Sequence, residues 1–264
     1  MSRYERWNAL MELLAEHRQL SVEEAAAALR VSAATIRRDL DQLARQQMLT
    51  RTRGGAVAHS VSYDLPLRYK TARNADEKQR IAAAAAELVS PGAVVGLNGG
   101  TTTTEVARAL VQRPDIAEQS DDGPSPALTV VTNALNIANE LAVRAQVKIV
   151  VTGGVARPQS YELTGPLAAG VLCELTLDVA ILGVDAVDAE HGATAHNEGE
   201  ASINRLLAER ARRVVLVADS SKIGNRAFAR ICPIGTVDVL VTDTGASEEA
   251  VHRLSEAGPQ VITA

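Results

Sequence analysis

Polar residues that directly follow short apolar runs are the first candidates for chemistry in this sequence. The apolar run at residues 93–97 is followed by Asn98, two glycines and Thr101 to Thr104, and residues 105–110 continue with helical periodicity. Glycines let the backbone approach a ligand closely, and the amides and dipole of a helix N-terminus favour an anion. The loop therefore predicts a phosphate site. It lacks the G-K-[ST] ending of a Walker loop and the GxGxxG spacing, so it gives little support to nucleotide binding.

Polar residues also follow the other apolar runs of strand length. Ligands of open parallel sheets bind beyond the carboxyl ends of the strands, so we expect these residues to line one crevice. Lys222 would bring a positive charge to it, unless it is an ordinary solvated lysine. The residues are Thr132 and Asn133, Thr152 to Gly154, Asp185, and Asp219 to Lys222.

The elements that would position these residues alternate in type. The apolar runs are short and rich in β-branched residues, and most are separated by segments with helical periodicity, beginning with a helix expected over residues 75–89. This alternation predicts βαβ units, a largely parallel sheet covered on both faces, and hence an α/β fold. The runs are residues 93–97, 128–132, 147–151, 179–183, 214–218 and 237–241.

A different architecture is predicted for residues 1–57. Helical apolar spacing runs from Trp7 to Leu14, a capping-box pattern at Ser21 and Glu24 precedes a second helix, and Ser32 can cap a third. Two short helices with a tight turn, followed by Thr and Arg at the start of the next helix, are the layout of a helix-turn-helix. Residues 49–57 place Arg at alternate positions before a Gly-Gly turn, which is typical of a wing.

Charge supports a polyanion partner for this first part. The net charge of the chain is −5, yet residues 1–57 carry nine Arg against seven acidic residues. A basic segment on an acidic chain indicates a nucleic-acid site. We expect the third helix to enter the major groove of DNA and the wing to contact phosphates or the minor groove. The expected contacts are Thr35, Arg37, Arg38, Arg51 and Arg53.

Composition excludes several classes of protein. Hydrophobic residues make up 46% and charged residues 22%, which is a globular balance, while aromatic residues at 2% leave almost nothing for stacking on single-stranded nucleic acid. The first twenty residues are charged and no run of about 18 apolar residues occurs, so we expect no membrane span or secretory signal and a cytoplasmic location. Cys173 and Cys232 lack metal-like spacing and are interpreted as buried apolar groups.

Two patterns near the N-terminus resemble the DNA-binding domain of the DeoR family of bacterial transcription regulators. They are V-S-x-x-T-I-R-R-D-L from Val31 to Leu40 and R-x-x-G-G-A from Arg51 to Ala56. The resemblance implies sequence-specific operator binding and adds Ser32 to the contacts. Asp39 also matches the pattern. Because its charge opposes phosphate, we interpret Asp39 as a structural partner that positions a neighbouring Arg.

The rest of the chain resembles the sensor domain of the same family, which shares its fold with ribose-phosphate isomerases and coenzyme A transferases. The matching runs are GGTTTTEVARAL, VVTNALNIANEL, VTGG, LTGPLA, ILGVDAVDAEHGAT and VADSSKIG. The resemblance implies no cofactor but a small-molecule effector, a sugar phosphate or related metabolite. Asn98 departs from the Asp common in the family, and an amide donates as well as accepts. The implied effector site is Asn98, Gly99, Gly100, Thr101, Thr102, Thr103, Thr132, Asn133, Gly154, Asp185, Glu200 and Lys222.

An isomerase-like enzyme with a fused helical domain is the rival interpretation. Isomerase relatives carry D-G-A-D-E-V-D where residues 182–188 are L-G-V-D-A-V-D, so two acidic residues are missing. Aldose-ketose proton transfer needs a positioned carboxylate, for which Glu198 and Glu200 remain. We favour binding without turnover and assign no catalytic residue. A plain protein-interaction module would not explain the clustered arginines.

The expected protein is thus a regulator, foremost a repressor of a sugar operon that a phosphorylated sugar relieves. We expect a DNA-binding domain at residues 1–57, a linker at 58–74 and a sensing domain at 75–264, with residues 112–126 as an exposed insertion. Symmetric operator half-sites imply a homodimer or homotetramer. No metal site is assigned, because the segment with His191 and His196 has loop composition and no compact ligand pattern.

Overall fold

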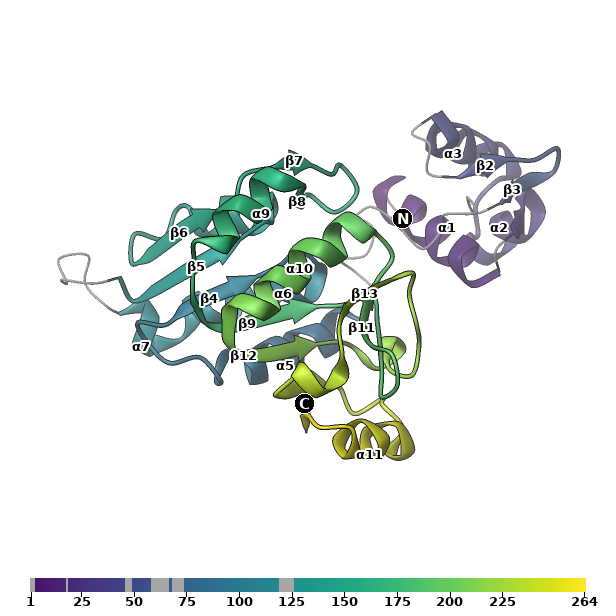
Figure 1. Cartoon of the computed structure of the whole chain (residues 1–264). Helices are drawn as coiled ribbons and strands as arrows, with labels where there is room; N and C mark the ends of the chain where they lie inside the picture. Colours follow the sequence, from purple (N-terminus) through teal and green to yellow (C-terminus); the bar gives the residue numbers. More distant parts are fainter. Residues whose placement is uncertain (1–2, 18, 46–48, 58–66, 68–73, 119–125) are drawn as a thin grey trace. The chain divides into compact units, whose positions relative to one another are not determined.

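The computed structural model describes residues 3–17, 19–45, 49–57, 67, 74–118 and 126–264 of the chain. Contacts divide the chain into two compact units, Met1–Lys70 and Thr71–Ala264 (Figure 1). Of the expected linker at residues 58–74, Leu67 and Asn74 are described and the others lie outside the described residues. None of the helices in the described ranges has the length and apolar character needed to cross a bilayer.

The N-terminal unit is the winged helix-turn-helix that its sequence predicts. Its elements are α1 (Arg3–His17), β1 (Gln19–Ser21), α2 (Val22–Leu29), α3 (Ala33–Arg45), β2 (Thr50–Arg51) and β3 (Gly55–Val57). The strands pair antiparallel in the order β1-β3-β2. Ser21 and Glu24 form the expected capping box, with backbone-to-side-chain hydrogen bonds of 3.1 and 2.9 Å. The apolar faces of the helices meet in one buried cluster, which gives the unit a hydrophobic core of its own.

The C-terminal unit is built on a parallel sheet. Its strands are β4 (Val94–Leu97), β5 (Leu128–Thr132), β6 (Val147–Val151), β9 (Leu177–Gly183), β12 (Ala211–Val217), β14 (Val239–Thr242) and β15 (Gln260–Thr263). They pair in the order β15-β14-β12-β9-β4-β5-β6, every pair being parallel. On one side of the β4–β9 pair, β5 and β6 follow β4. On the other side, β12, β14 and β15 follow β9. That pair is therefore a topological switch point, where open α/β sheets bind ligands.

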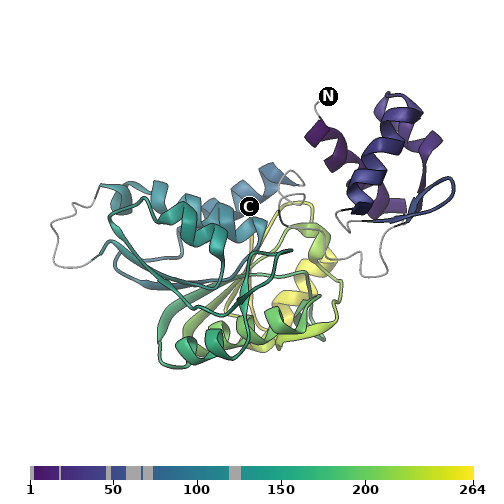
Figure 2. The same ribbon diagram turned by 90° about the horizontal axis from the view of Figure 1, so that it is seen from above.

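Helices cover both faces of this sheet, as Figure 2 shows. The helices of one face are α5 (Ala75–Ala86), α6 (Thr101–Gln112), α7 (Pro114–Ala117) and α8 (Leu135–Leu141). The helices of the other face are α9 (Pro166–Cys173), α10 (Glu198–Arg210) and α11 (Glu248–Glu256). The predicted α/β fold is confirmed.

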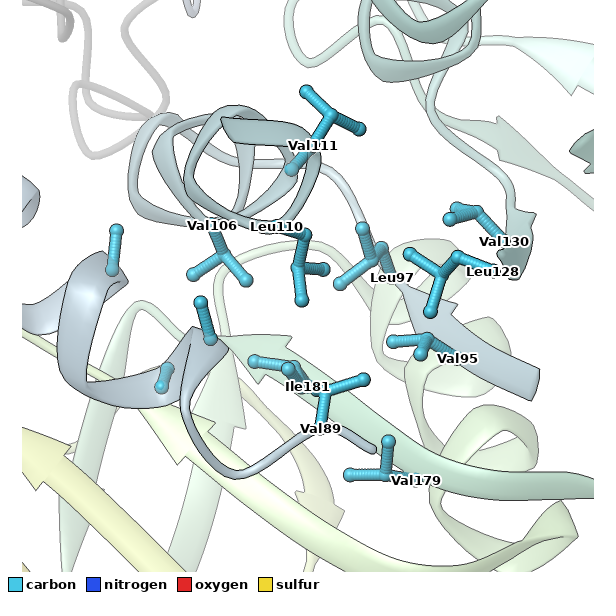
Figure 3. Packing of buried hydrophobic residues seen from close by; sticks show 14 of the residues in the cluster. Val89, Val95, Leu97, Val106, Leu110, Val111, Leu128, Val130, Val179 and Ile181 are labelled. Atoms are coloured by element: carbon cyan, nitrogen blue, oxygen red, sulfur yellow. The ribbon is translucent and has the colours of Figure 1, made fainter. Parts of the chain in front are cut away.

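Alternate residues of β9 enter the two cores. Val179 and Ile181 belong to the cluster under α5 and α6, whereas Ala180 and Leu182 belong to the cluster under α9 and α10. Figure 3 shows the first cluster, with Ile181 facing the side chains of α6. Because both faces are buried, the strand is a continuous apolar run and shows no polar alternation.

Short strands outside the main sheet were not predicted. They are β7 (Val155–Ala156), β8 (Leu163–Thr164), β10 (Ala186–Asp188), β11 (Gly192–Ala195) and β13 (Ala229–Cys232). β7 and β8 form a hairpin, and β10, β11 and β13 form a small antiparallel sheet. Strands this short carry no measurable periodicity, which is why the sequence pattern missed them.

Two smaller expectations were wrong. The tract at residues 112–126 is not wholly an exposed insertion, because α7 lies in it and Ile116 is fully buried; residues 119–125 lie outside the described residues. Cys173 is exposed at the end of α9, whereas Cys232 is buried as expected. In α9 the buried positions are Ala168 and Leu172, so the residue after Leu172 turns away from the core.

Candidate functional site

The start of α3 presents a polar, cationic surface. The Ser32 hydroxyl accepts the Thr35 N–H at 3.2 Å and lies 2.9 Å from the Thr35 hydroxyl, so Ser32 caps the helix. Arg37 and Arg38 are exposed, while Ile36 and Leu40 are buried. The Arg37 guanidinium lies 3.8 Å from the Glu23 carboxylate, and both are exposed, so this ion pair contributes little and leaves Arg37 able to reorient.

The two wing arginines differ in their surroundings. The Arg51 Nε donates to the Asp41 carboxylate at 2.7 Å, and the Arg51 guanidinium also donates to the Gly55 carbonyl. Arg51 therefore connects the wing to α3. Arg53 is exposed and makes no hydrogen bond or ion pair with any residue that the structure describes.

Gly55 has a structural reason to be glycine. A Cβ atom at this position would lie 2.0 Å from the Leu20 carbonyl oxygen, because β3 crosses close to β1. Gly55 of the wing pattern is thus required by strand packing, whereas a Cβ at Gly54 would meet no atom within 4 Å. The close packing of β3 on β1 at Gly55 holds the wing beside the helices whether or not the wing contacts DNA.

Asp39 is a structural residue, as interpreted from the sequence. Its carboxylate is 3% exposed and accepts hydrogen bonds from the Trp7 Nε1 at 2.8 Å and from the Arg6 guanidinium, including Nη2 at 3.1 Å. The hydrogen bond to Asp39 raises the pKa of Arg6. The arginine that Asp39 positions is therefore in α1, and the bond network fixes α1 against α3.

In the C-terminal unit, Asn98 joins the two strands of the switch point. Its Nδ2 donates to the Gly183 carbonyl at 2.9 Å, and its Oδ1 accepts the Gly183 N–H at 2.8 Å. The side chain is 2% exposed. Both amide atoms are thus engaged with the backbone at the end of β9. An aspartate carboxylate would satisfy only the Gly183 N–H.

The loop after β4 has the geometry of an anion cradle. Gly100 is the N-cap of α6 with φ 140°, a conformation that side chains rarely adopt. Its carbonyl accepts the Thr103 and Thr104 hydroxyls at 3.2 and 2.6 Å, which orders the first turn. The first amides of a helix have no intrahelical acceptor, so the N–H groups of Thr101 to Thr103 are suited to an anion.

A buried carboxyl that was not predicted, Glu162, lies against this loop. Its Oε1 accepts the Gly99 N–H at 2.7 Å, and its side chain is 3% exposed. A Cβ at Gly99 would lie 2.3 Å from the Glu162 Cγ, so this glycine is needed for the contact. The one sequence signal is that Glu162 directly precedes the LTGPLA run, which by itself says nothing about its role.

Glu162 has a second carboxyl and an arginine as neighbours. Glu200, which was predicted to be in the site, is 8% exposed and accepts the Arg157 Nη1 at 3.0 Å. Burial, together with the nearby Glu200 carboxyl, raises the pKa of Glu162 to about 8. Asn133 is fully buried, and its Nδ2 donates to the Leu163 carbonyl at 3.3 Å.

The other predicted effector residues lie at the same edge of the sheet. Thr132 ends β5 and Asn133 follows it, Gly154 follows β6, Asp185 follows β9, and Lys222 ends a short 3-10 helix after β12. The Asp185 carboxylate accepts the His196 N–H at 2.9 Å. Gly154 has φ 120°, and a Cβ there would lie 2.7 Å from the Thr164 carbonyl, so its role includes packing of the β7–β8 hairpin.

The histidines near Asp185 have structural contacts. The Asp188 carboxylate accepts the His191 N–H, and the His191 Nδ1 lies 3.0 Å from the same carboxylate. Within the described ranges, no group of at least three His, Cys, Asp or Glu is arranged to hold a metal ion.

Comparisons with known proteins match both units. A family described as the DeoR-like helix-turn-helix domain matches residues 6–61, and the DeoR C terminal sensor domain matches residues 73–244. A putative aga operon transcriptional repressor of Escherichia coli O157:H7 is 34% identical over 98% of this chain and 93% of its own. The glycerol-3-phosphate regulon repressor of Escherichia coli K12 is 33% identical, covering 92% of each chain.

Among solved structures, ribose 5-phosphate isomerase A of Methanocaldococcus jannaschii superposes with a TM-score of 0.40 and 22% identity, covering 56% of this chain and 54% of that chain. The family matches and the relatives agree with the winged helix-turn-helix and the parallel α/β unit described above. The chain therefore belongs to the DeoR family of transcriptional regulators.

Proposed function

We propose that this regulator represses a sugar or carbohydrate catabolism operon, and that a phosphorylated sugar bound in the C-terminal unit lowers its affinity for operator DNA. The observation that carries the proposal is the anion cradle of Gly99 to Thr103, which lies at the switch point of the sheet in a chain that also has a winged helix-turn-helix. The relatives named as repressors of the aga operon and of the glycerol-3-phosphate regulon support the same class of target.

On the DNA side, the exposed arginines of α3 are the base-reading candidates. Arginine binds guanine bidentately in the major groove, and a good pair of this kind contributes about 1–3 kcal/mol of discrimination. Arg37 and Arg38 are exposed at the start of α3, with Ser32 and Thr35 one turn earlier. Arg53 and Arg51 would contact the backbone or minor groove from the wing, Arg51 after exchanging its bond to Asp41 for one to phosphate.

On the effector side, the cradle would hold the phosphate and the carboxyl ends of the neighbouring strands would hold the sugar. The first-turn amides of α6 suit a phosphate, and Lys222 supplies positive charge after β12. Thr132, Asn133, Asp185 and Glu200 offer donors and acceptors to sugar hydroxyls. The proposed ligand is a small-molecule effector, and no cofactor is invoked.

The positions of the acids missing from the isomerase pattern favour binding without turnover. Leu182 and Ala186 are buried in the apolar core, at 0% and 2% exposure. A carboxylate there would be desolvated against apolar neighbours, so these positions can no longer supply a base.

The effector site and the DNA-binding site would be coupled thermodynamically, so that binding at one changes the affinity at the other. Effectors of this kind shift affinity by about 1–3 kcal/mol, provided that they bind the two arrangements of the protein unequally. We propose a homodimer or homotetramer, since paired half-sites require symmetry-related recognition helices. DNA binding would take place in the cytoplasm.

A gel-shift titration tests the proposal. The full chain is mixed with the DNA upstream of its own gene and of the adjacent genes, with and without glycerol 3-phosphate, fructose 1-phosphate, fructose 6-phosphate and glucose 6-phosphate. We expect a specific complex that at least one sugar phosphate releases at a concentration where the parent sugar does not. A complex that none of a broad set of sugar phosphates alters, although one of them binds the protein, would overturn the sensing role.

A further inference from the structure

Glu162 reaches the cradle because a hairpin carries it there. The segment between β7 and β8 returns the chain toward β5, where Glu162 forms an antiparallel bridge with Ala134 and Leu163 donates its N–H to the Asn133 carbonyl at 2.7 Å. Arg157, at the start of this segment, donates its N–H to the Glu162 carbonyl at 2.8 Å. The hairpin thus fixes the backbone of both charged residues relative to the sheet edge.

The carboxyl of Glu162 contacts parts of the site that come from three different elements. Its Oε1 accepts the Gly99 N–H of the β4 loop at 2.7 Å and lies 3.5 Å from the Asn133 Nδ2 after β5. The Glu200 carboxyl, in the first turn of α10, is close enough to raise the pKa of Glu162. Glu162 is therefore placed to set the spacing between the cradle and the residues proposed to hold the sugar.

The charges of Glu162, Glu200 and Arg157 sum to zero only when one of the two carboxyls carries a proton. Glu200 is paired with Arg157 at 3.0 Å, which leaves the Glu162 carboxyl as the uncompensated group beside it. Two neighbouring buried carboxyls repel each other strongly when both are ionised, which favours one proton on the pair. With that proton the group of Glu162, Glu200 and Arg157 is neutral and adds no net negative charge beside a phosphate on the adjacent cradle.

We propose that Glu162 is a positioning residue of the effector site: it fixes the Gly99 end of the cradle and, in its protonated form, keeps the wall formed by Glu200 and Arg157 neutral beside a bound phosphate ester. This inference rests on the proposed function, because it assumes that a phosphorylated sugar occupies the cradle. It adds a residue and a protonation state to that site, and it predicts that binding of the effector requires a proton on the carboxyl pair.

Binding of the effector should weaken as the pH rises. Ionisation of Glu162 places a negative charge next to the cradle and weakens the binding of an anion. The pKa of Glu162, raised to about 8 by burial and by Glu200, puts this change between pH 7.5 and 9. The second ionisation of a phosphate ester is complete below this range, with a pKa of about 6, and an ordinary histidine titrates near 6.5.

The test is calorimetric titration of the full chain at pH 7.5 and pH 9 with the four phosphate esters of the gel-shift assay and with inorganic phosphate. The variants are Glu162→Gln, a neutral side chain of the same shape, Glu162→Ala, and Glu174→Gln as the matched control at an exposed position of the same unit. Circular dichroism melting establishes that each variant is folded.

We expect the wild type and Glu174→Gln to bind the tightest ester about tenfold more weakly at pH 9 than at pH 7.5, as one required proton on a group with a pKa of about 8 gives. Glu162→Gln should bind within about threefold of the wild type at pH 7.5 and lose the pH dependence, and folded Glu162→Ala should bind at least about tenfold more weakly.

Equal wild-type affinity at the two pH values, or a Glu162→Gln variant that keeps the wild-type pH dependence, would overturn the role of Glu162 while leaving the proposed function intact. A wild type that binds none of the phosphate probes at either pH would instead overturn the proposed function, and the role of Glu162 with it.

Discussion

The indole Nε1 of Trp7 donates a hydrogen bond to the buried Asp39 carboxylate at 2.8 Å, which joins the first helix of the DNA-binding unit to its recognition helix. Arg6 completes the set of donors to the same carboxylate. The orientation of α3 therefore depends on a buried charge, whereas Arg37 and Arg38 of the same helix are exposed.

Replacing Asp39 by alanine should destabilise the N-terminal unit by about 3 kcal/mol, because the buried Trp7 N–H and the partly buried Arg6 guanidinium would lose their acceptor. Trp7 is the one tryptophan of the chain, so urea unfolding followed by its fluorescence reports on this unit alone. Asp41→Ala removes an exposed partner of Arg51 and serves as the control, with an expected change below about 1 kcal/mol. Equal effects of the two variants would contradict the structural role of Asp39.

The wing arginines should contribute to the salt dependence of DNA binding. Arg53→Ala is expected to weaken binding to all sequences and to lower the slope of log K against log salt by about one, as for the loss of one phosphate contact. The same change in slope is predicted for Arg51→Ala. Fluorescence anisotropy with specific and unrelated duplexes between low and moderate salt gives both slopes.

Arg51→Ala and Arg53→Ala should differ in their effect on the stability of the N-terminal unit. Arg51 contacts Asp41 and Gly55 in the protein without DNA, so Arg51→Ala should also lower the stability of the N-terminal unit slightly, whereas Arg53→Ala should not. A slope unchanged by Arg51→Ala would remove this residue from the phosphate contacts and leave it a purely structural role.

Asn98→Asp should destabilise the C-terminal unit. The carboxylate accepts the Gly183 N–H but faces the Gly183 carbonyl, which loses its buried donor, and the expected loss is about 1–3 kcal/mol. Thermal unfolding by far-UV circular dichroism measures it, with Asn225→Asp in an exposed loop as the control. An unchanged melting temperature would show that Asn98 does not hold the strand ends together.

Much of the fold follows from sequence patterns because its elements are long or strongly marked. The β9 run is continuous in apolar residues because both faces of the strand are buried. The capping box of Ser21 and Glu24 predicts the start of α2. The loop from Gly99 to Thr103 was predicted because glycine and threonine directly follow a strand. In each case the signal lies within a dozen consecutive residues.

The features that were missed depend on contacts between distant segments. Glu162 enters the site through a hairpin of two-residue strands, and its partner Gly99 is 63 residues away in sequence. The residue type of Arg51 and its place in the wing predict a phosphate contact. Its hydrogen bond to Asp41 becomes visible only in the folded unit, where the wing packs on α3. Local pattern cannot supply such information, because it arises from tertiary packing.

We propose that the sugar phosphate and the operator prefer different arrangements of the protein, so that each weakens the binding of the other, and a linkage experiment measures this coupling. The sugar phosphate that releases DNA is titrated by calorimetry into the free protein and into the protein saturated with operator. We predict that its Kd is weaker for the complex by the factor by which it weakens operator binding, about 5- to 150-fold for a coupling of this type. Equal Kd values for the free protein and the complex would show that the sugar phosphate does not regulate operator binding.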